Sequence, residues 1–125
     1  MQKDFDLSHL TELEYEVTQN AKTEAPFTGI YNDCFENGVY VCKVCGSNLF
    51  SSKSKFESSC GWPSFFEGIE SSIDYLEDLS HGMVRTEILC KRCGSHLGHV
   101  FDDGYGTKTG KRYCVNSASL DFIES

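Results

Sequence analysis

The sequence lacks the clustered basic residues of a nucleic-acid-binding protein. Its 11 Lys and Arg residues are outnumbered by 19 Asp and Glu residues, so the formal net charge is −8. Proteins that bind nucleic acids gain much of their affinity from cations that neutralise phosphates. This charge balance argues against a nucleic-acid partner, and we expect none.

Long hydrophobic runs are also absent. The apolar stretches are only a few residues long, whereas a helix that crosses a membrane needs about 20 apolar residues. The first ten residues, MQKDFDLSHL, contain acidic side chains where a signal peptide would have an apolar segment. We therefore expect no membrane segment and a cytoplasmic location.

Proline is scarce, and the sequence has no repeats, low-complexity tracts or linker-like stretches. Only Pro26 and Pro63 occur in a chain of 125 residues, which is the usual size of one domain. We expect a single domain over residues 1–125. A monomer is expected because there is no coiled-coil or long apolar pattern.

The pattern of apolar residues predicts a mainly β protein. Residues 7–18 have apolar side chains at helical spacing, beginning with Leu7 and Leu10, which predicts a short N-terminal helix. Four later segments are richer in β-branched and aromatic residues, as expected of strands: 38–44, 82–90, 96–101 and 111–122. The expected fold is a mainly antiparallel β domain with one or two short helices.

Cysteine is abundant by comparison, since the chain has seven. Structural disulfides are rare in a reducing cytoplasm, so metal binding or thiol chemistry is the better interpretation. The stretches CKVCG, ending at Gly46, and CKRCG, ending at Gly94, each place two thiols two residues apart before a glycine. The metal ligands expected from this pattern are Cys42, Cys45, Cys90 and Cys93.

Two such turns can complete a tetrahedral zinc site with four thiolate ligands. Each pair could instead be a redox dithiol, or the thiols could be small core residues, but two matched pairs favour zinc. A closed four-thiolate site leaves no coordination position for a substrate. The zinc would therefore be structural, and would pin the two ends of a small sheet.

Outside the two pairs are Cys34, Cys60 and Cys114. Cys34 is in a polar, turn-like segment, and we assign it no function. Cys60 begins the turn sequence CGWPSF, which includes Trp62. Cys60 is either a resolving thiol that forms a disulfide with an oxidised cysteine, or an ordinary loop cysteine beside a core tryptophan.

Cys114 lies in RYCVNSASL, residues 112–120, which is expected to be a strand. Alternation along a strand puts Arg112, Cys114 and Asn116 on one face. A cation beside a thiol favours the thiolate, which is the nucleophilic form. A buried free cysteine is the alternative, but it would have apolar neighbours on its own face. The pattern therefore favours a nucleophile assisted by Arg112.

The four histidines differ in their context. His96 and His99 directly follow the second cysteine pair. Both could bind metal, but four thiolates already fill a zinc ion, so a general acid or hydrogen-bond donor is the more useful hypothesis. His9 and His81 have no supporting context, and we expect solvated or capping roles for them.

Five segments, in chain order, resemble the methionine-R-sulfoxide reductases of class B: PFTGIY, KFESSCGWPSF, HGMVRTEI, CGSHLGHVFDDG and RYCVNSASLDF. With the two cysteine pairs, they resemble the zinc-containing, two-cysteine form of this family over nearly the whole chain. The resemblance implies two small antiparallel sheets, a short N-terminal helix and one structural zinc ion per chain. It also implies reduction of the R epimer of methionine sulfoxide, mainly in proteins, with thioredoxin as the reductant.

The resemblance further implies roles for individual residues. Cys114 matches the nucleophile of the family, Cys60 the resolving cysteine, and His99 a catalytic histidine. Positions that build the substrate pocket are matched by Trp62, His96 and Asn116. The chain departs from the family at Tyr105, where a proline is usual, and at Cys34, which is not a family feature.

These roles fit the chemistry of a sulfoxide. Its sulfur becomes electrophilic when its oxygen is protonated or hydrogen-bonded, so the site needs a thiolate and a donor. Cys114 would attack sulfur while His99 donates to oxygen. Trp62 would hold the methyl group on one side and so select one epimer. The sulfenic acid formed on Cys114 would then condense with Cys60.

Two other functions fit parts of the pattern. A zinc-stapled β module that binds a protein partner would have no need of Cys114 as a nucleophile. A thioredoxin-like oxidoreductase would use a Cys-x-x-Cys pair for redox chemistry, but it would also need a βαβ pattern that the sequence lacks.

Overall fold

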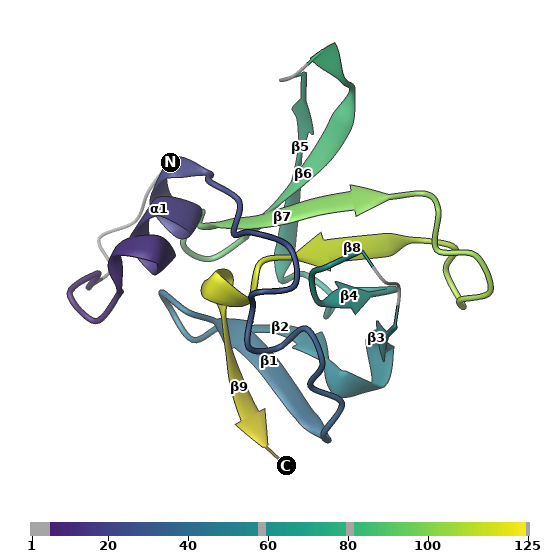
Figure 1. Ribbon diagram of the computed structural model, residues 1–125, viewed down its shortest axis with the longest axis horizontal. Coiled ribbons are helices and arrows are strands. Elements are labelled where there is room, and N and C mark those ends of the chain that lie inside the picture. Colours follow the sequence, from purple (N-terminus) through teal and green to yellow (C-terminus); the bar gives the residue numbers. More distant parts are fainter. Residues whose placement is uncertain (1–5, 58–59, 80–81, 125) are drawn as a thin grey trace.

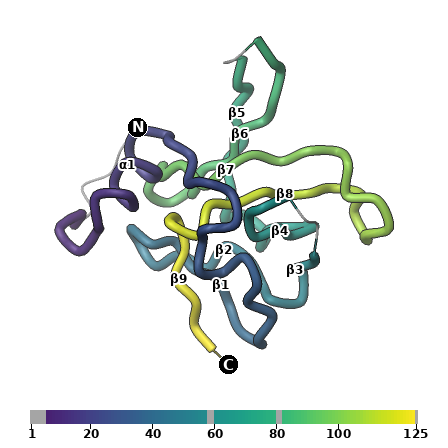
Figure 2. Tube along the Cα trace, in the orientation of Figure 1, coloured from purple at the N-terminus to yellow at the C-terminus, as the bar shows by residue number. Residues whose placement is uncertain are grey.

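The structure is a computed structural model that describes residues 6–57, 60–79 and 82–124. Strands dominate, and α1 (Glu12–Asn20) is the one α-helix among these residues (Figure 1). Short 3-10 helices occur at η1 (Ser52–Ser54) and η3 (Ser117–Ser119). The trace in Figure 2 shows the C-terminal strand returning to lie beside β1 (Gly38–Cys42).

The described strands form two antiparallel sheets, which confirms the expected fold class. The three-stranded sheet has the order β2 (Asn48–Ser51), β1 (Gly38–Cys42), β9 (Leu120–Glu124). The six-stranded sheet has the order β3 (Lys55–Phe56), β4 (Ser64–Phe65), β8 (Arg112–Val115), β7 (His96–Phe101), β6 (Arg85–Cys90), β5 (Ile73–Asp78). The β5–β6 hairpin extends away from the rest of the molecule in Figure 1.

Helix α1 begins later than the apolar spacing predicted. The expected helix at residues 7–18 is wrong at its start, because Thr11 and Glu14 form a capping box. The Thr11 hydroxyl accepts from the Glu14 amide at 3.2 Å, and the Glu14 carboxylate accepts from the Thr11 amide at 2.9 Å. Leu7 and Leu10 precede the helix and pack against the core. No helix in the described ranges combines the length and apolar character that a membrane crossing requires.

The segment expected as one strand at residues 111–122 is broken in the middle. It pairs as β8 in the six-stranded sheet, turns through η3, and continues as β9 in the three-stranded sheet. Asn116 lies at the break, as the residue before η3. The polypeptide therefore leaves the six-stranded sheet after Val115, and Asn116 at the break lines the cavity described below.

The core between the two sheets is rich in aromatic rings. Tyr40 of β1, Phe50 of β2 and Phe65 of β4 are fully buried. The rings of Phe50 and Phe65 stack with centroids 4.4 Å apart, and Tyr40 meets Phe65 edge-on at 5.1 Å. Both arrangements are favourable for aromatic pairs. Because Phe65 is paired with Tyr113, this core supports the strand on which Cys114 lies.

Candidate active site and metal centre

A cavity of about 200 Å³ opens where β7, β8 and the Cys60 turn meet. It brings together six of the residues that the sequence singled out for chemistry: Cys60, Trp62, His99, Arg112, Cys114 and Asn116. Residues that sequence reasoning missed complete the wall: Thr23, Arg85, Gly98 and Phe101.

Strand pairing fixes the position of Cys114. In the antiparallel register, Cys114 lies opposite His99 of β7 on one side and Ser64 of β4 on the other. Directly paired residues share one face of a sheet, and Cys114 and His99 both line the cavity, whereas Ser64 is buried behind it. A side chain at Gly98 would overlap the backbone carbonyl of Cys114. The glycine therefore allows β7 to approach β8 closely at this point.

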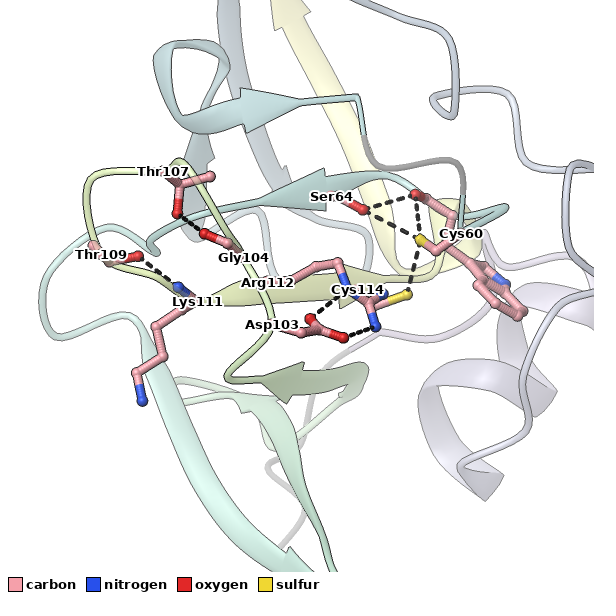
Figure 3. A network of polar contacts seen from close by, with 10 residues as sticks. Cys60, Ser64, Asp103, Gly104, Thr107, Thr109, Lys111, Arg112 and Cys114 are labelled. Atoms are coloured by element: carbon pink, nitrogen blue, oxygen red, sulfur yellow. Dashed lines mark hydrogen bonds and ion pairs between the residues drawn. The ribbon is translucent and has the colours of Figure 1, made fainter.

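The sulfur atoms of Cys60 and Cys114 lie 3.5 Å apart (Figure 3). The Cys60 thiol also lies 3.3 Å from the Ser64 hydroxyl oxygen and 3.4 Å from the Trp62 carbonyl oxygen. Gly61 has a φ of 99°, a value that side chains disfavour, and so permits the sharp turn after Cys60. The two thiols come from segments far apart in the chain, yet only a small movement is needed to join them.

Arg112 is held by a carboxylate as well as lying beside the thiols. Its guanidinium donates two hydrogen bonds to Asp103, at 2.8 and 3.1 Å (Figure 3). These bonds lower the pKa of Asp103. The guanidinium also lies over the Phe101 ring, 4.6 Å from its centroid. Asp103 therefore fixes the orientation of Arg112 and offsets part of its charge.

Neighbouring groups act in opposite directions on the ionisation of Cys114. Contact with the Cys60 thiol and burial together raise the pKa of Cys114, and the opposing effect of Arg112 is smaller. Arg112 acts in the direction expected from the sequence, but Cys60 and burial outweigh it while both thiols are reduced. A buried thiol beside a second sulfur gives up its proton less readily, because the charged form loses hydration and meets a like group.

The two histidines after the second cysteine pair occupy different environments. His99 lines the cavity, and its Nε2 lies 2.8 Å from a carboxylate oxygen of Asp78, which also accepts from Arg85 at 3.2 Å. His96 is buried and is not among the described residues that line the cavity; its Nδ1 lies 2.7 Å from Glu87. Burial lowers the pKa of His96. The rings of His96 and His99 meet edge-on at 5.7 Å.

The other two histidines are His9 and His81, of which the structure describes only His9. His9 is exposed, and its Nε2 donates to the carbonyl oxygen of Lys43 at 2.8 Å. His81, for which a solvated or capping role was expected, lies outside the described residues. Cys34 packs against the core, and its carbonyl oxygen accepts from the Tyr40 hydroxyl at 3.1 Å.

Trp62 and Asn116 are both anchored to Glu24, which sequence reasoning missed. The indole N–H of Trp62 donates to the Glu24 carbonyl oxygen at 3.0 Å. The Asn116 side-chain oxygen accepts from the Glu24 amide at 2.9 Å, and its NH₂ group donates to the Leu97 carbonyl at 3.0 Å. No spacing or motif in the sequence pointed to Glu24, because its contacts join segments that are distant along the chain.

The thiols of Cys42, Cys45, Cys90 and Cys93 form a separate cluster, with all four sulfurs within 4.8 Å of one another. The pairs Cys42–Cys93 and Cys45–Cys90 have sulfur–sulfur distances of 3.6 Å. Tetrahedral zinc with Zn–S bonds of about 2.3 Å requires sulfurs about 3.8 Å apart. The donor set and its dimensions therefore fit one zinc ion.

Two matching turns shape this candidate metal centre. The Gly46 amide donates to the Cys42 carbonyl at 2.9 Å, and the Gly94 amide donates to the Cys90 carbonyl at 2.7 Å. Both glycines have a positive φ, 78° and 79°. Cys42 ends β1 and Cys90 ends β6. The cluster therefore joins two different sheets, and the expectation that it pins the ends of one sheet is wrong.

Known proteins are similar to this sequence over most of its length. Residues 10–124 match the SelR domain family. The chain is 57% identical over 114 residues to the peptide methionine sulfoxide reductase MsrB of Burkholderia mallei strain SAVP1, covering 90% of this chain and 80% of that protein. The MsrB proteins of Burkholderia pseudomallei strain K96243 and Burkholderia lata strain 383 are 57% and 56% identical over the same lengths. The chain therefore belongs to the SelR domain family, together with the peptide methionine sulfoxide reductases MsrB.

Proposed function

We propose that the protein reduces methionine sulfoxide to methionine, acting on the R epimer and mainly on residues within proteins. The observation that supports this most directly is the 3.5 Å separation of the Cys60 and Cys114 sulfurs in a cavity lined by His99 and Trp62. A sulfoxide reductase needs a nucleophilic thiol, a donor for the oxygen and a second thiol to complete the cycle.

In the first step, the thiolate of Cys114 attacks the sulfoxide sulfur while His99 supplies a proton to the oxygen. An ionised carboxylate can only accept hydrogen bonds, so Nε2 of His99 donates to Asp78, and this bond fixes the orientation of the ring. The proton given to the sulfoxide oxygen comes from the other ring nitrogen, Nδ1, so His99 enters this step as the imidazolium and leaves it as the neutral ring. The oxygen ends on Cys114 as a sulfenic acid, and methionine is released. Cys114 is thereby oxidised by two electrons, and the substrate is reduced by two.

In the second step, the Cys60 sulfur attacks the sulfenic acid of Cys114. A disulfide forms, and the oxygen leaves as water, which carries the hydrogen of the sulfenic acid and the proton of the Cys60 thiol. The sulfurs must approach from 3.5 Å to the covalent distance of about 2.0 Å. Thioredoxin then reduces the disulfide with its own pair of thiols and is itself oxidised. A monomer in the reducing cytoplasm is the setting that suits this cycle.

The remaining pocket residues set orientation and selectivity. Trp62 offers an aromatic wall for the methyl group of the substrate, so that one epimer presents its oxygen to His99. Arg112 favours the thiolate of Cys114, against the effects of Cys60 and burial. Asn116 shapes the cavity floor through its two backbone contacts. His96 packs against His99 and supports its orientation, rather than contacting substrate.

We also propose that one structural zinc ion per chain is held by Cys42, Cys45, Cys90 and Cys93. When bound, the ion would offset part of the negative charge of the four thiolates and would hold the two sheets together. A four-thiolate site leaves no open position, so the ion takes no part in the reaction.

The test is an assay on a peptide that contains methionine sulfoxide as resolved epimers, with dithiothreitol as reductant. We expect turnover of the R epimer, little turnover of the S epimer, and none in Cys114→Ser. Turnover of the S epimer alone, or of neither epimer, would contradict the proposal. A zinc-stapled binding module would give no turnover and would keep its partner binding in Cys114→Ser.

A further inference from the structure

We propose that Glu24 is the positioning residue that sets the two pocket residues Trp62 and Asn116 in place. This inference rests on the proposed function, because it assigns a role in the same cavity. Glu24 itself is not among the described residues that line the cavity. It acts through hydrogen bonds to Trp62 and Asn116, which do line the cavity.

The Glu24 carboxylate is fixed by backbone amides of η3, the short helix that follows β8. It is only 3% exposed. One carboxylate oxygen accepts from the Ser117 amide at 3.0 Å and the other from the Ala118 amide at 2.9 Å. Both oxygens therefore have a donor, which offsets the cost of burying the group.

The backbone of Glu24 binds two residues that line the cavity. Its amide donates to the Asn116 side-chain oxygen at 2.9 Å, and its carbonyl accepts from the Trp62 indole at 3.0 Å. The residue before it, Thr23, lines the cavity directly. Glu24 thus connects three segments through its side chain and its backbone together: the chain before Pro26, the turn after Cys60 and the break between β8 and β9.

The surrounding chain needs this anchor. Residues 22–37 contain no helix or strand, so their position depends on side-chain contacts rather than on a hydrogen-bonded ladder. Gly29 also packs so closely that a side chain there would overlap the Glu24 carboxylate and the Ser117 side chain. The carboxylate therefore has a fitted niche, with two amide donors aimed into it.

A glutamine at this position cannot replace the carboxylate. A carboxamide offers one accepting oxygen, and its NH₂ group would face one of the two amide donors. Glu24→Gln therefore loses one buried hydrogen bond and adds a donor–donor contact. The segment should loosen, and Trp62 should lose its fixed position over the cavity.

The experiment uses Glu24→Gln, with the exposed Glu70→Gln as the matched control. Trp62 is the only tryptophan in the chain, so tryptophan fluorescence measures how accessible its side chain is, independently of activity. We expect Glu24→Gln to increase acrylamide quenching of Trp62 and to lower kcat/KM with dithiothreitol by about tenfold, the equivalent of one lost buried hydrogen bond. Glu70→Gln should match the parent protein in both measurements.

A double-mutant comparison separates positioning from general destabilisation. In a Trp62→Phe background, Glu24→Gln should lower kcat/KM by less than in the parent, about threefold or under, because the indole hydrogen bond to Glu24 is already lost. Equal losses in both backgrounds, with unchanged Trp62 quenching, would overturn the inference. If Glu24→Gln fails to fold, Glu24→Asp replaces it, because aspartate keeps the charge on a shorter side chain. Trp62 quenching and the loss of kcat/KM in the two backgrounds are then measured for Glu24→Asp and judged in the same way.

The inference can fail separately from the proposed function. If the parent protein turns over the R epimer but Glu24→Gln behaves as Glu70→Gln does, only the role of Glu24 is wrong. If the parent protein has no reductase activity, the quenching measurement still shows whether Glu24 holds Trp62.

Discussion

At the scale of single residues, the reactivity of Cys114 depends on two neighbours that act in opposite directions. The Cys60 contact raises the pKa of Cys114, and Arg112 lowers it. Asp103 limits the effect of Arg112 because it binds the guanidinium through two hydrogen bonds. A substrate that separates the two sulfurs on binding would therefore make Cys114 a better nucleophile.

This balance predicts the pH dependence of alkylation at Cys114. Only the thiolate reacts, so a raised pKa moves the onset of reaction to higher pH. Cys60→Ser removes the largest raising effect, so Cys114 should react with iodoacetamide at lower pH and several-fold faster at neutral pH than in the parent. Arg112→Gln should move the onset to higher pH. Peptide mapping by mass spectrometry measures the rate at Cys114, and an unchanged onset in both variants would contradict this balance.

The resolving role of Cys60 makes a second prediction at the residue scale. Cys60→Ser should lose thioredoxin-dependent turnover by at least about 100-fold, because no disulfide can form for thioredoxin to reduce. With dithiothreitol it should keep measurable activity, since a small thiol can reduce the sulfenic acid directly. Cys34→Ser is the control and should match the parent with both reductants. Equal loss with both reductants would mean that Cys60 is structural.

At the scale of elements, the start of α1 shows how local chemistry overrides apolar spacing. Leu7 and Leu10 extend the helical spacing toward the N-terminus, yet the helix begins only after them, at the capping box formed by Thr11 and Glu14. A side-chain acceptor at Thr11 satisfies an amide that the first helical turn leaves without a partner. The sequence contained this signal, since a threonine followed three residues later by a glutamate marks a helix start.

The cap predicts a modest effect on stability. Thr11→Ala should lower the free energy of unfolding by about 1 kcal/mol, the usual cost of losing a helix cap. For a chain of this length, that corresponds to a fall in Tm of about 4 °C. Thr11→Ser keeps a hydroxyl acceptor and should stay near the parent value. Thermal unfolding followed by circular dichroism measures both, and equal losses in the two variants would argue against the cap.

The break between β8 and β9 is the element that sequence reasoning could not place. Residues 111–122 have strand composition throughout, and nothing in RYCVNSASL marks a helical turn. The break depends on Glu24, whose carboxylate accepts from the amides of Ser117 and Ala118. A partner distant in sequence thus decides local structure here, as tertiary contacts often do when propensities are weak.

At the scale of the whole molecule, the candidate metal centre links the two sheets at the ends of β1 and β6. A single domain over residues 1–125 stays a prediction, and the metal centre explains how a small core could hold two sheets together. Metal binding to such a site contributes directly to folding, because the unfolded chain has no preformed site.

Removal of one metal ligand should therefore destabilise the whole fold. Cys90→Ser should abolish stoichiometric zinc and lower Tm by more than about 10 °C, because structural zinc contributes several kcal/mol of folding energy. Cys34→Ser should keep both zinc and Tm. Elemental analysis and thermal unfolding are the measurements. A parent protein with less than one zinc per chain, or an unchanged Tm in Cys90→Ser, would contradict the structural role of the metal.

Local patterns in the sequence predicted the strand-rich fold class, the four metal-ligand candidates and the polar face that carries Cys114, because two residues between cysteines or alternation along a strand fixes where neighbouring side chains point. The roles expected of Cys60 and His99 came from the resemblance to the methionine-R-sulfoxide reductases, since local spacing left open an ordinary loop cysteine and did not separate His99 from His96. Only the tertiary structure decided that Cys60 and Cys114, 54 residues apart, lie within 3.5 Å, and that Glu24 reaches Asn116 across 92 residues. Strand register and core packing set such contacts, and neither is written in the spacing of any one segment.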